Sequence, residues 1–259
     1  MTLELPQSVT QFIGDAERID DEIGMSPCRV QSFLKHGERF YLKSSSAIYA
    51  PTTYSVTREA RVLDWLAGHL NVPEVVLVAG SSNGDENMIT RAVPGAPFSA
   101  RVEAGKPVLD LFIEAVRQLQ AVPVDHCPFD ASAAVRLQEL EYLIGSGLVA
   151  DDADLSQWPG LNSPEDLLAR LQSNVPQEDR LFSHGDLCDS NVFVDAHDNL
   201  HFIDLGRAGL ADRWLDITFV HRNLQEEISD AIAAQFLDAL GEPDAAHKRK
   251  FFVELDELF

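Results

Sequence analysis

The sequence is poor in cysteine and in basic residues, and each shortage excludes a class of protein. Its 259 residues include three cysteines, Cys28, Cys127 and Cys188, which lie far apart without Cys-x-x-Cys spacing. Neither a disulfide framework nor a zinc site is therefore expected. Twenty lysines and arginines stand against 42 acids, for a formal net charge of −22. Because nucleic acids and anionic membranes bind basic patches, neither is an expected partner. Such a surface would attract a cationic small molecule, although it could also serve solubility alone.

Long apolar runs and two familiar phosphate-binding motifs are missing as well. No stretch approaches the ~20 consecutive apolar residues of a membrane span. The N-terminus, M-T-L-E-L-P-Q-S, lacks the basic start and apolar core of a signal peptide, so we expect a cytoplasmic protein. There is no G-x-x-x-x-G-K-[ST] and no G-x-G-x-x-G, which excludes a P-loop enzyme.

The pattern of apolar and polar residues along the chain predicts an α+β protein with two lobes. The first part alternates short β-like runs with one clear helix. Its expected elements are strands at 28–34 and 39–43, which form a hairpin around residues 35–38, further strands at 75–78 and 87–92, and a helix at 56–70. Beyond them the pattern becomes helical, with apolar stripes at 109–116, 137–144 and 228–240 and an N-cap serine at Ser163. We therefore expect a small β-rich N-terminal lobe over 1–92, a linker at 93–97 and a larger, mainly helical lobe over 98–259.

One non-helical island interrupts the helical part. Residues 192–195 and 200–204 alternate as two short strands around a polar turn, which predicts a hairpin. His184-Gly185-Asp186 precedes the hairpin, Asn191 comes five residues after Asp186, and Asp204-Leu205-Gly206 follows. Kinases use this order and spacing for phosphoryl transfer from a nucleotide. Asp186 fits the carboxylate that meets the attacking hydroxyl, whereas Asn191 and Asp204 offer the hard oxygen ligands that magnesium prefers.

A kinase pattern also requires a lysine on an early strand and a glutamate on the helix that follows. Lys43 ends the alternating run F-Y-L-K, and Glu59 lies in the first turn of the expected helix. Lys43 would hold the α- and β-phosphates of the nucleotide, with Glu59 fixing its side chain. Met25 and Ser26, in the turn before the first of these strands, are further candidates for phosphate contact, although an ordinary turn explains them equally well.

With these residues in place, the chain resembles the aminoglycoside 3′-phosphotransferases, bacterial antibiotic-resistance kinases with a protein-kinase-like fold. The resemblance extends over essentially the whole chain and is strongest toward the amikacin-resistance branch. It rests on the stretches 23–27, 52–60, 127–129, 182–191, 202–216 and 255–257.

This resemblance implies transfer of the γ-phosphate of ATP, with Mg²⁺, to the 3′-hydroxyl of kanamycin- or neomycin-type drugs. It implies that Asp186 is catalytic, that Asn191 and Asp204 bind the metal, and that Thr90 to Ala92 form the adenine-binding hinge. It also implies a set of residues that contact the cationic drug: Asp189, Arg207, Asp256, Glu257 and the Phe259 carboxylate. Of these, Arg207 is a cation, which brings no electrostatic benefit beside a cationic drug.

Two features outside the catalytic island bear on the drug. The chain ends in E-L-D-E-L-F, which concentrates negative charge where carboxylates could form charge-assisted hydrogen bonds with ammonium groups. A terminal helix with Phe251, Phe252, Leu255 and Phe259 in the core is compatible with this, because the acids would occupy its other face. The loop at 151–160 departs from the family, since Ser156, Gln157 and Pro159 stand where some members carry acids or amides.

Three other interpretations compete with this one. A kinase of another small metabolite, such as choline or homoserine, would share the island but would not need the acidic terminus. A catalytically dead nucleotide-binding module would have lost an aspartate or the lysine, and none of the expected positions is lost. A general acidic binding protein would not require the ordered pattern at all. The oligomeric state cannot be predicted from these patterns.

Overall fold

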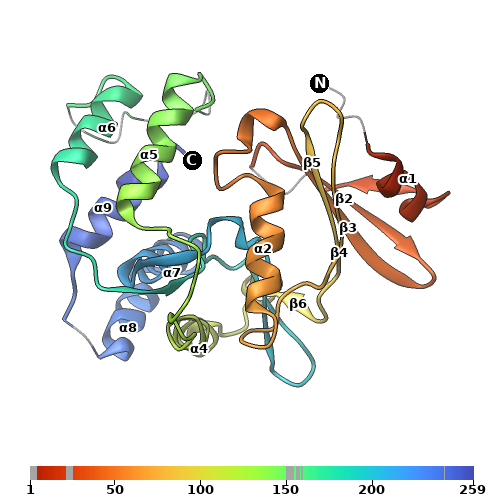
Figure 1. The fold of residues 1–259 in the computed structure, drawn as a ribbon. Coiled ribbons are helices and arrows are strands. Elements are labelled where there is room, and N and C mark those ends of the chain that lie inside the picture. Colours follow the sequence, from red (N-terminus) through yellow and green to blue (C-terminus); the bar gives the residue numbers. More distant parts are fainter. Residues whose placement is uncertain (1–4, 22–25, 150–154, 156–157, 159, 242) are drawn as a thin grey trace. The chain divides into compact units, whose positions relative to one another are not determined.

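The computed structural model describes residues 5–21, 26–149, 155, 158, 160–241 and 243–259 (Figure 1). Its packing divides the chain into two compact units, residues 1–97 with 191–207 and residues 98–190 with 208–259. The units are not continuous in sequence, because the segment 191–207 belongs to the first. The linker predicted at 93–97 and the lobes of 1–92 and 98–259 stay predictions. The predicted α+β composition is confirmed within the described ranges.

The first unit is built on an antiparallel five-stranded sheet with the order β1-β2-β3-β5-β4. Its strands are β1 (Arg18–Asp20), β2 (Arg29–Lys35), β3 (Glu38–Ser45), β4 (Val75–Gly80) and β5 (Glu86–Arg91). The hairpin predicted around residues 35–38 is confirmed, because β2 and β3 pair from Lys35↔Glu38 to Arg29↔Ser44. Strand β1, which sequence patterning missed, pairs with β2.

Two helices and a short 3-10 turn complete this part of the unit. They are α1 (Gln7–Ile13), η1 (Ala47–Tyr49) and α2 (Val56–Leu66). Val9 and Ile13 of α1 pack with Phe33, Phe40 and Ile89 of the sheet in a buried apolar cluster. Burial of such side chains is the main free-energy term that holds a small unit together.

The predicted helix at 56–70 starts as expected and ends early. Ser55 is its N-cap and accepts a hydrogen bond from the Arg58 N–H, whereas Ala67 (φ −56°, ψ 119°) already leaves the helix. Gly68 follows with a positive φ of 91°, a conformation that glycine adopts without strain. The expectation that Leu70 extends the apolar face of this helix was therefore wrong, although Leu63 and Leu66 are buried as predicted.

A second, three-stranded sheet of the first unit contains the predicted catalytic hairpin. Its strands are β6 (Ala96–Pro97), β8 (Val192–Val194) and β9 (Leu200–Phe202), in the order β6-β8-β9. The register Val192↔Phe202 confirms the hairpin, and the turn η3 (Leu205–Arg207) follows it. Gly95 (φ 92°) is required beside β8, since a Cβ there would lie 2.2 Å from the Val194 carbonyl oxygen.

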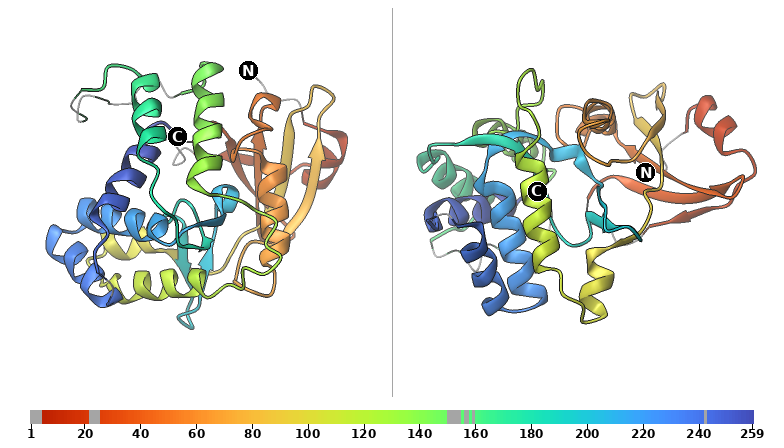
Figure 2. Two further views of the ribbon diagram at one scale, coloured as in Figure 1. Left: turned by 60° about the vertical axis from the view of Figure 1, so that its left-hand side comes forward. Right: turned by 90° about the horizontal axis from the view of Figure 1, so that it is seen from below.

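The second unit is mainly helical. Its helices are α3 (Phe98–Glu103), α4 (Leu109–Gln120), α5 (Ala133–Gly145), α6 (Pro164–Ser173), α7 (Trp214–Glu227), α8 (Asp230–Leu240) and α9 (Ala246–Asp256). Strands β7 (Arg180–Ser183) and β10 (Gly209–Asp212) pair antiparallel within it. Helices α7, α8 and α9 pack together and are the blue group in Figures 1 and 2.

One sequence-predicted helix start is confirmed in this unit, and most of the predicted apolar stripe at 228–240 forms a second helix. Ser163 caps α6 through the Asp166 N–H, with Pro164 at the first helical position. Helix α8 begins after its cap Ser229 and ends at Gly241, which is left-handed. In the part of the chain that the structure describes, no helix is both long and apolar enough to cross a membrane.

Candidate functional site

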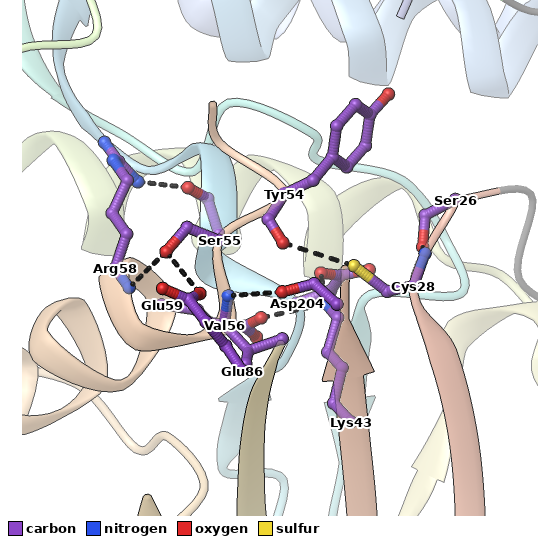
Figure 3. A network of polar contacts seen from close by, with 12 residues as sticks. Ser26, Cys28, Lys43, Tyr54, Ser55, Val56, Arg58, Glu59, Glu86 and Asp204 are labelled. Carbon is purple, nitrogen blue, oxygen red and sulfur yellow. Dashed lines mark hydrogen bonds and ion pairs between the residues drawn. The ribbon is translucent and has the colours of Figure 1, made fainter. Parts of the chain in front are cut away.

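Two carboxylates of the first unit, Glu59 and Asp204, meet the Lys43 ammonium group (Figure 3). Lys43 lies near the end of β3, opposite Met88 of β5 and Val30 of β2. Its Nζ is 2.8 Å from Glu59 Oε2 and 2.5 Å from Asp204 Oδ1. The strand, helix α2 and the segment after β9 thus each contribute one residue. The sequence predicted these three residues as one functional group, and the structure brings them together.

The two carboxylates set the charge state of this lysine. Burial alone would lower the pKa of Lys43, but Asp204 and Glu59 outweigh it and hold the pKa well above its ordinary value. Glu59 is 5% exposed, and a buried carboxylate without a partner is strongly unfavourable. The pair therefore keeps Lys43 cationic and in a fixed position, as a phosphate-binding group requires.

The segment that carries Asp204 is fastened to the start of α2. The Arg58 guanidinium donates to the Gly206 carbonyl, and Arg207 donates to the Tyr54 hydroxyl at 2.9 Å. Gly206 also lies so close to residue 53 that a Cβ would be 2.7 Å from the Thr53 carbonyl oxygen. Arg207, predicted as a drug contact, here packs against Tyr54, with its guanidinium carbon 5.5 Å from the ring centroid.

The hairpin holds the two predicted metal ligands near each other. Asn191 directly precedes β8 and Asp204 comes two residues after β9. The Ile203 N–H donates to the Asn191 carbonyl at 3.0 Å, which extends the ladder by one pair. Asp204 has a φ of 56°, a left-handed conformation that is rare outside glycine and often found at functional sites. Asn191 and Asp204 thus lie at the same end of a two-stranded ribbon.

Asp186 lies on a loop of the second unit that is held on two sides. Asp216, in the first turn of α7, accepts hydrogen bonds from the His184 N–H (2.8 Å) and the Gly185 N–H (2.9 Å). Arg136 of α5, 3% exposed, donates to the Gly185 carbonyl at 3.1 Å. The backbone before Asp186 is therefore fixed by two buried charged side chains.

Two of the acids predicted to bind the drug are held by neighbouring residues of α7. Asp189 exchanges hydrogen bonds with Asn223, and Asp256 forms an ion pair with Arg222 at 2.6 Å. Burial would lower the pKa of Arg222, but Asp256, Glu226 and Asp186 together raise it above its ordinary value. Arg222 is thus a permanent cation among acids.

The rest of the predicted C-terminal site follows α9. Phe251, Phe252 and Leu255 are buried as predicted, whereas Phe259 is half-buried and Leu258 takes a core position. Glu257 directly follows the helix and is half-buried. The acids and the apolar side chains therefore do share this segment, as the sequence indicated.

The positions predicted near the adenine and the phosphates, and those of the loop at 151–160, add little to the description of the site. Thr90 is buried on β5, and the Ala92 N–H donates to the Arg39 carbonyl at 3.0 Å. The Ser26 hydroxyl accepts from the Cys28 N–H at 3.3 Å. Met25, Ser156, Gln157 and Pro159 lie outside the described residues.

Sequence reasoning missed the residues that support the site. Arg136 and Arg222 each look like a solvent-facing cation on a helix and belong to no local motif, whereas Arg58 lay within the stretch 52–60 but received no role. Asp216 lay within a stretch quoted for the family resemblance but received no role. Their position in the chain could have indicated two of them, because Arg58 and Asp216 both lie in the first turn of a helix.

Comparison with known proteins shows the family to which the chain belongs. The model of the phosphotransferase enzyme family matches residues 30–252. An aminoglycoside 3′-phosphotransferase of Acinetobacter baumannii is 40% identical, with 99% of this chain and 100% of that protein aligned. One of Enterococcus faecalis is 36% identical, with 93% of each aligned. The crystal structure of an aminoglycoside-3′-phosphotransferase of type VIII superposes with a TM-score of 0.82 at 30% identity, covering 98% of this chain and 97% of that one.

Proposed function

Because this chain belongs to the phosphotransferase enzyme family and, within it, to the aminoglycoside 3′-phosphotransferases, we propose that it transfers the γ-phosphate of ATP to the 3′-hydroxyl of an aminoglycoside. A drug phosphorylated in this way would no longer act, so the enzyme would confer resistance. The observation that carries the proposal from the structure is the position of Lys43 between Glu59 and Asp204.

In the proposed reaction, Lys43 binds the α- and β-phosphates while Glu59 keeps its ammonium group in place. The adenine would lie against the strand end at Thr90 to Ala92, with Ser26 and Met25 near the phosphates. A nucleotide brings its own negative charge, so Asp204 would exchange its contact with Lys43 for a contact with a cation.

The donor atoms fit Mg²⁺. Asn191 and Asp204 provide an amide and a carboxylate oxygen, and Mg²⁺ is typically bound by one or two such groups together with water and substrate phosphates. When bound, the ion would neutralise charge on the phosphate oxygens. Its ligands from this chain would be Asn191 and Asp204.

Asp186 would accept the proton of the drug hydroxyl. The hydroxyl oxygen then bonds to the γ-phosphorus, the bond between that phosphorus and the β,γ-bridging oxygen breaks, and ADP leaves. The hydrogen bonds from His184 and Gly185 to Asp216 support this role, because they fix the backbone that presents Asp186.

The drug would be bound by carboxylates. Asp189, Asp256, Glu257 and the Phe259 carboxylate would meet its ammonium groups, and the net charge of −22 would steer a polycation toward the protein. The contact that Arg207 makes with Tyr54 supports a structural role for this arginine better than direct drug binding.

An assay of ATP consumption tests the proposal with kanamycin, neomycin, amikacin, choline and homoserine as acceptors. Turnover is expected with kanamycin and is expected to vanish with a kanamycin analogue that lacks the 3′-hydroxyl. Asp186→Ala should lower turnover by several orders of magnitude while ATP still binds. Turnover with choline or homoserine and with none of the aminoglycosides would instead support the metabolite-kinase alternative.

A further inference from the structure

Two residues that face each other across strands β3 and β5 reach the start of helix α2. Ser45 and Glu86 are register partners in the sheet. The Ser45 hydroxyl accepts the Val56 N–H at 3.4 Å, and Glu86 Oε2 accepts the Thr57 N–H at 3.1 Å. Glu86 Oε2 also accepts the Ser55 hydroxyl at 2.7 Å, as Figure 3 shows. A strand pair therefore binds two consecutive amides of one helix.

These contacts satisfy donors that a helix cannot satisfy by itself. The first N–H groups of an α-helix have no partner within it. In α2 the N–H groups of Val56 and Thr57 go to the strands, and the Arg58 N–H goes to Ser55 Oγ at 3.1 Å. The Glu86 carboxylate also lies at the positive end of the helix dipole, where a negative charge is stabilising.

The same strand and helix meet a second time at the charged group of the site. Lys43 comes two residues before Ser45 on β3, so the two side chains point to one face of the strand. Glu59 comes three residues after Val56, about one turn along α2. Ser45–Val56 and Lys43–Glu59 thus form two successive links between β3 and α2, with Glu86 bracing the first of them from β5.

We propose that Glu86 is a positioning residue for phosphoryl transfer: it fixes the N-terminal turn of α2 so that Glu59 stays on Lys43 before any nucleotide binds. This inference rests on the proposed function, because it takes Lys43 as the group that binds ATP phosphates. It assigns to a strand carboxylate, outside the sequence motifs, the task of keeping the helix in its active position.

A displacement of the first turn of α2 would also reach Asp204, through Arg58. Arg58 donates to the Gly206 carbonyl, and Asp204 itself contacts Lys43. A shift of the first turn of α2 would therefore move Glu59 and loosen the segment 204–207 together. Both the lysine and one proposed metal ligand would lose their fixed positions, whereas the residues proposed to bind the drug would not.

The test compares Glu86→Ala and Glu86→Gln with the unaltered enzyme. Steady-state KM is measured for ATP and for kanamycin, together with kcat, ATP binding by calorimetry and thermal unfolding. Glu86→Ala should raise the KM and Kd for ATP about tenfold, since hydrogen bonds to a charged acceptor are among the stronger ones. The kanamycin KM should stay within about twofold, because the drug residues keep their own hydrogen bonds. Glu86→Gln keeps an acceptor oxygen and should restore most of the ATP affinity.

Ser229→Ala is the matched control, because it removes the cap of α8, where Ser229 Oγ accepts the Ile232 N–H at 3.3 Å. It should lower thermal stability without changing the KM for ATP. If Glu86→Ala behaves like Ser229→Ala, losing stability only, the positioning role is wrong. If the unaltered enzyme phosphorylates no aminoglycoside, the proposed function fails instead, and the binding data for ATP still decide the role of Glu86.

Discussion

Asn223 and Asp189 hold each other by two hydrogen bonds that run in opposite directions. The Asp189 N–H donates to Asn223 Oδ1 at 3.2 Å, and Asn223 Nδ2 donates to Asp189 Oδ1 at 3.3 Å. One amide side chain on α7 therefore fixes both the backbone and the carboxylate of a residue proposed to bind the drug. Such support from a second layer of residues is what gives a binding carboxylate a defined direction.

Asn223→Ala is expected to weaken drug binding selectively. Loss of two ordinary hydrogen bonds should raise the KM for kanamycin about three- to tenfold, with the ATP KM unchanged. Steady-state kinetics with each substrate varied in turn measure both values. Gln225→Ala on the same helix is the control, because its amide contacts Asp230 instead. Equal effects of the two substitutions on the kanamycin KM would argue against a role for Asn223 in binding.

Asp256→Asn is expected to raise the drug KM more than Glu257→Gln does. Asp256 is paired with Arg222, so its neutralisation removes an anion and also leaves the guanidinium facing a cationic drug. We expect about a tenfold increase or more for Asp256→Asn, comparable to the loss of one charge partner at a partly buried pair. The double variant Arg222→Gln/Asp256→Asn should have a drug KM lower than that of Asp256→Asn alone. Kinetics at two salt concentrations should show that the increase in drug KM caused by Asp256→Asn is smaller at high salt. No recovery in the double variant would contradict this explanation.

Gly206→Ala is expected to impair both stability and catalysis. An added Cβ would lie 2.7 Å from the Thr53 carbonyl oxygen, and such overpacking costs roughly 1–3 kcal/mol. Because the displaced segment carries Asp204, kcat should fall by more than the loss of folded enzyme alone would explain. Urea unfolding and kinetics measure the two effects.

Gly145→Ala, at the end of α5, has nothing within 4 Å of the new Cβ and serves as the control. It should be neutral or more stable by about 0.5–1 kcal/mol, since alanine is favoured over glycine in a helix. A Gly206→Ala enzyme as active and stable as this control would show that the segment tolerates movement.

Cys28 and Cys188 are expected to react slowly with alkylating reagents. Burial raises the pKa of each thiol to about 11, and only the thiolate is a good nucleophile. At pH 8.5, mass spectrometry should show slow modification of both residues by iodoacetamide in the folded protein and fast modification in urea. Because the folded state favours the protonated thiol, stability should fall as the pH rises from the ordinary thiol pKa toward 11. Equal alkylation rates in the two states would contradict the assigned burial.

Local signals in the sequence were sufficient for much of the catalytic framework. Alternation around residues 35–38 predicted the β2–β3 hairpin, and the serine cap of α6 was predicted because capping depends on a few neighbouring residues. The grouping of Lys43, Glu59 and Asp204 was also predicted, because the spacing of the motifs leaves few arrangements that can serve one phosphate group.

Contacts over long sequence separations could not be read in this way. The pairing of β7 with β10 joins short, weakly patterned segments, and the Arg136–Gly185 contact spans 49 residues. The end of α2 was misplaced because leucine and alanine favour a helix beyond Leu66, whereas Gly68 and the hydrogen bond from Asn71 to the Leu200 carbonyl end it. In each case tertiary contacts decided between locally similar options.

The discontinuity of the two units has a consequence for how this enzyme can be divided or recombined. The chain passes from one unit to the other at 97/98, 190/191 and 207/208. A fragment that ends at Pro97 would contain Lys43 and Glu59 but would lack Asp204, and the complementary fragment would carry the hairpin without its β6 partner. A single genetic crossover between residues 97 and 98 would therefore join a lysine from one parent to an aspartate from another. New drug specificities should arise by point substitution in the second unit more readily than by exchange of whole halves.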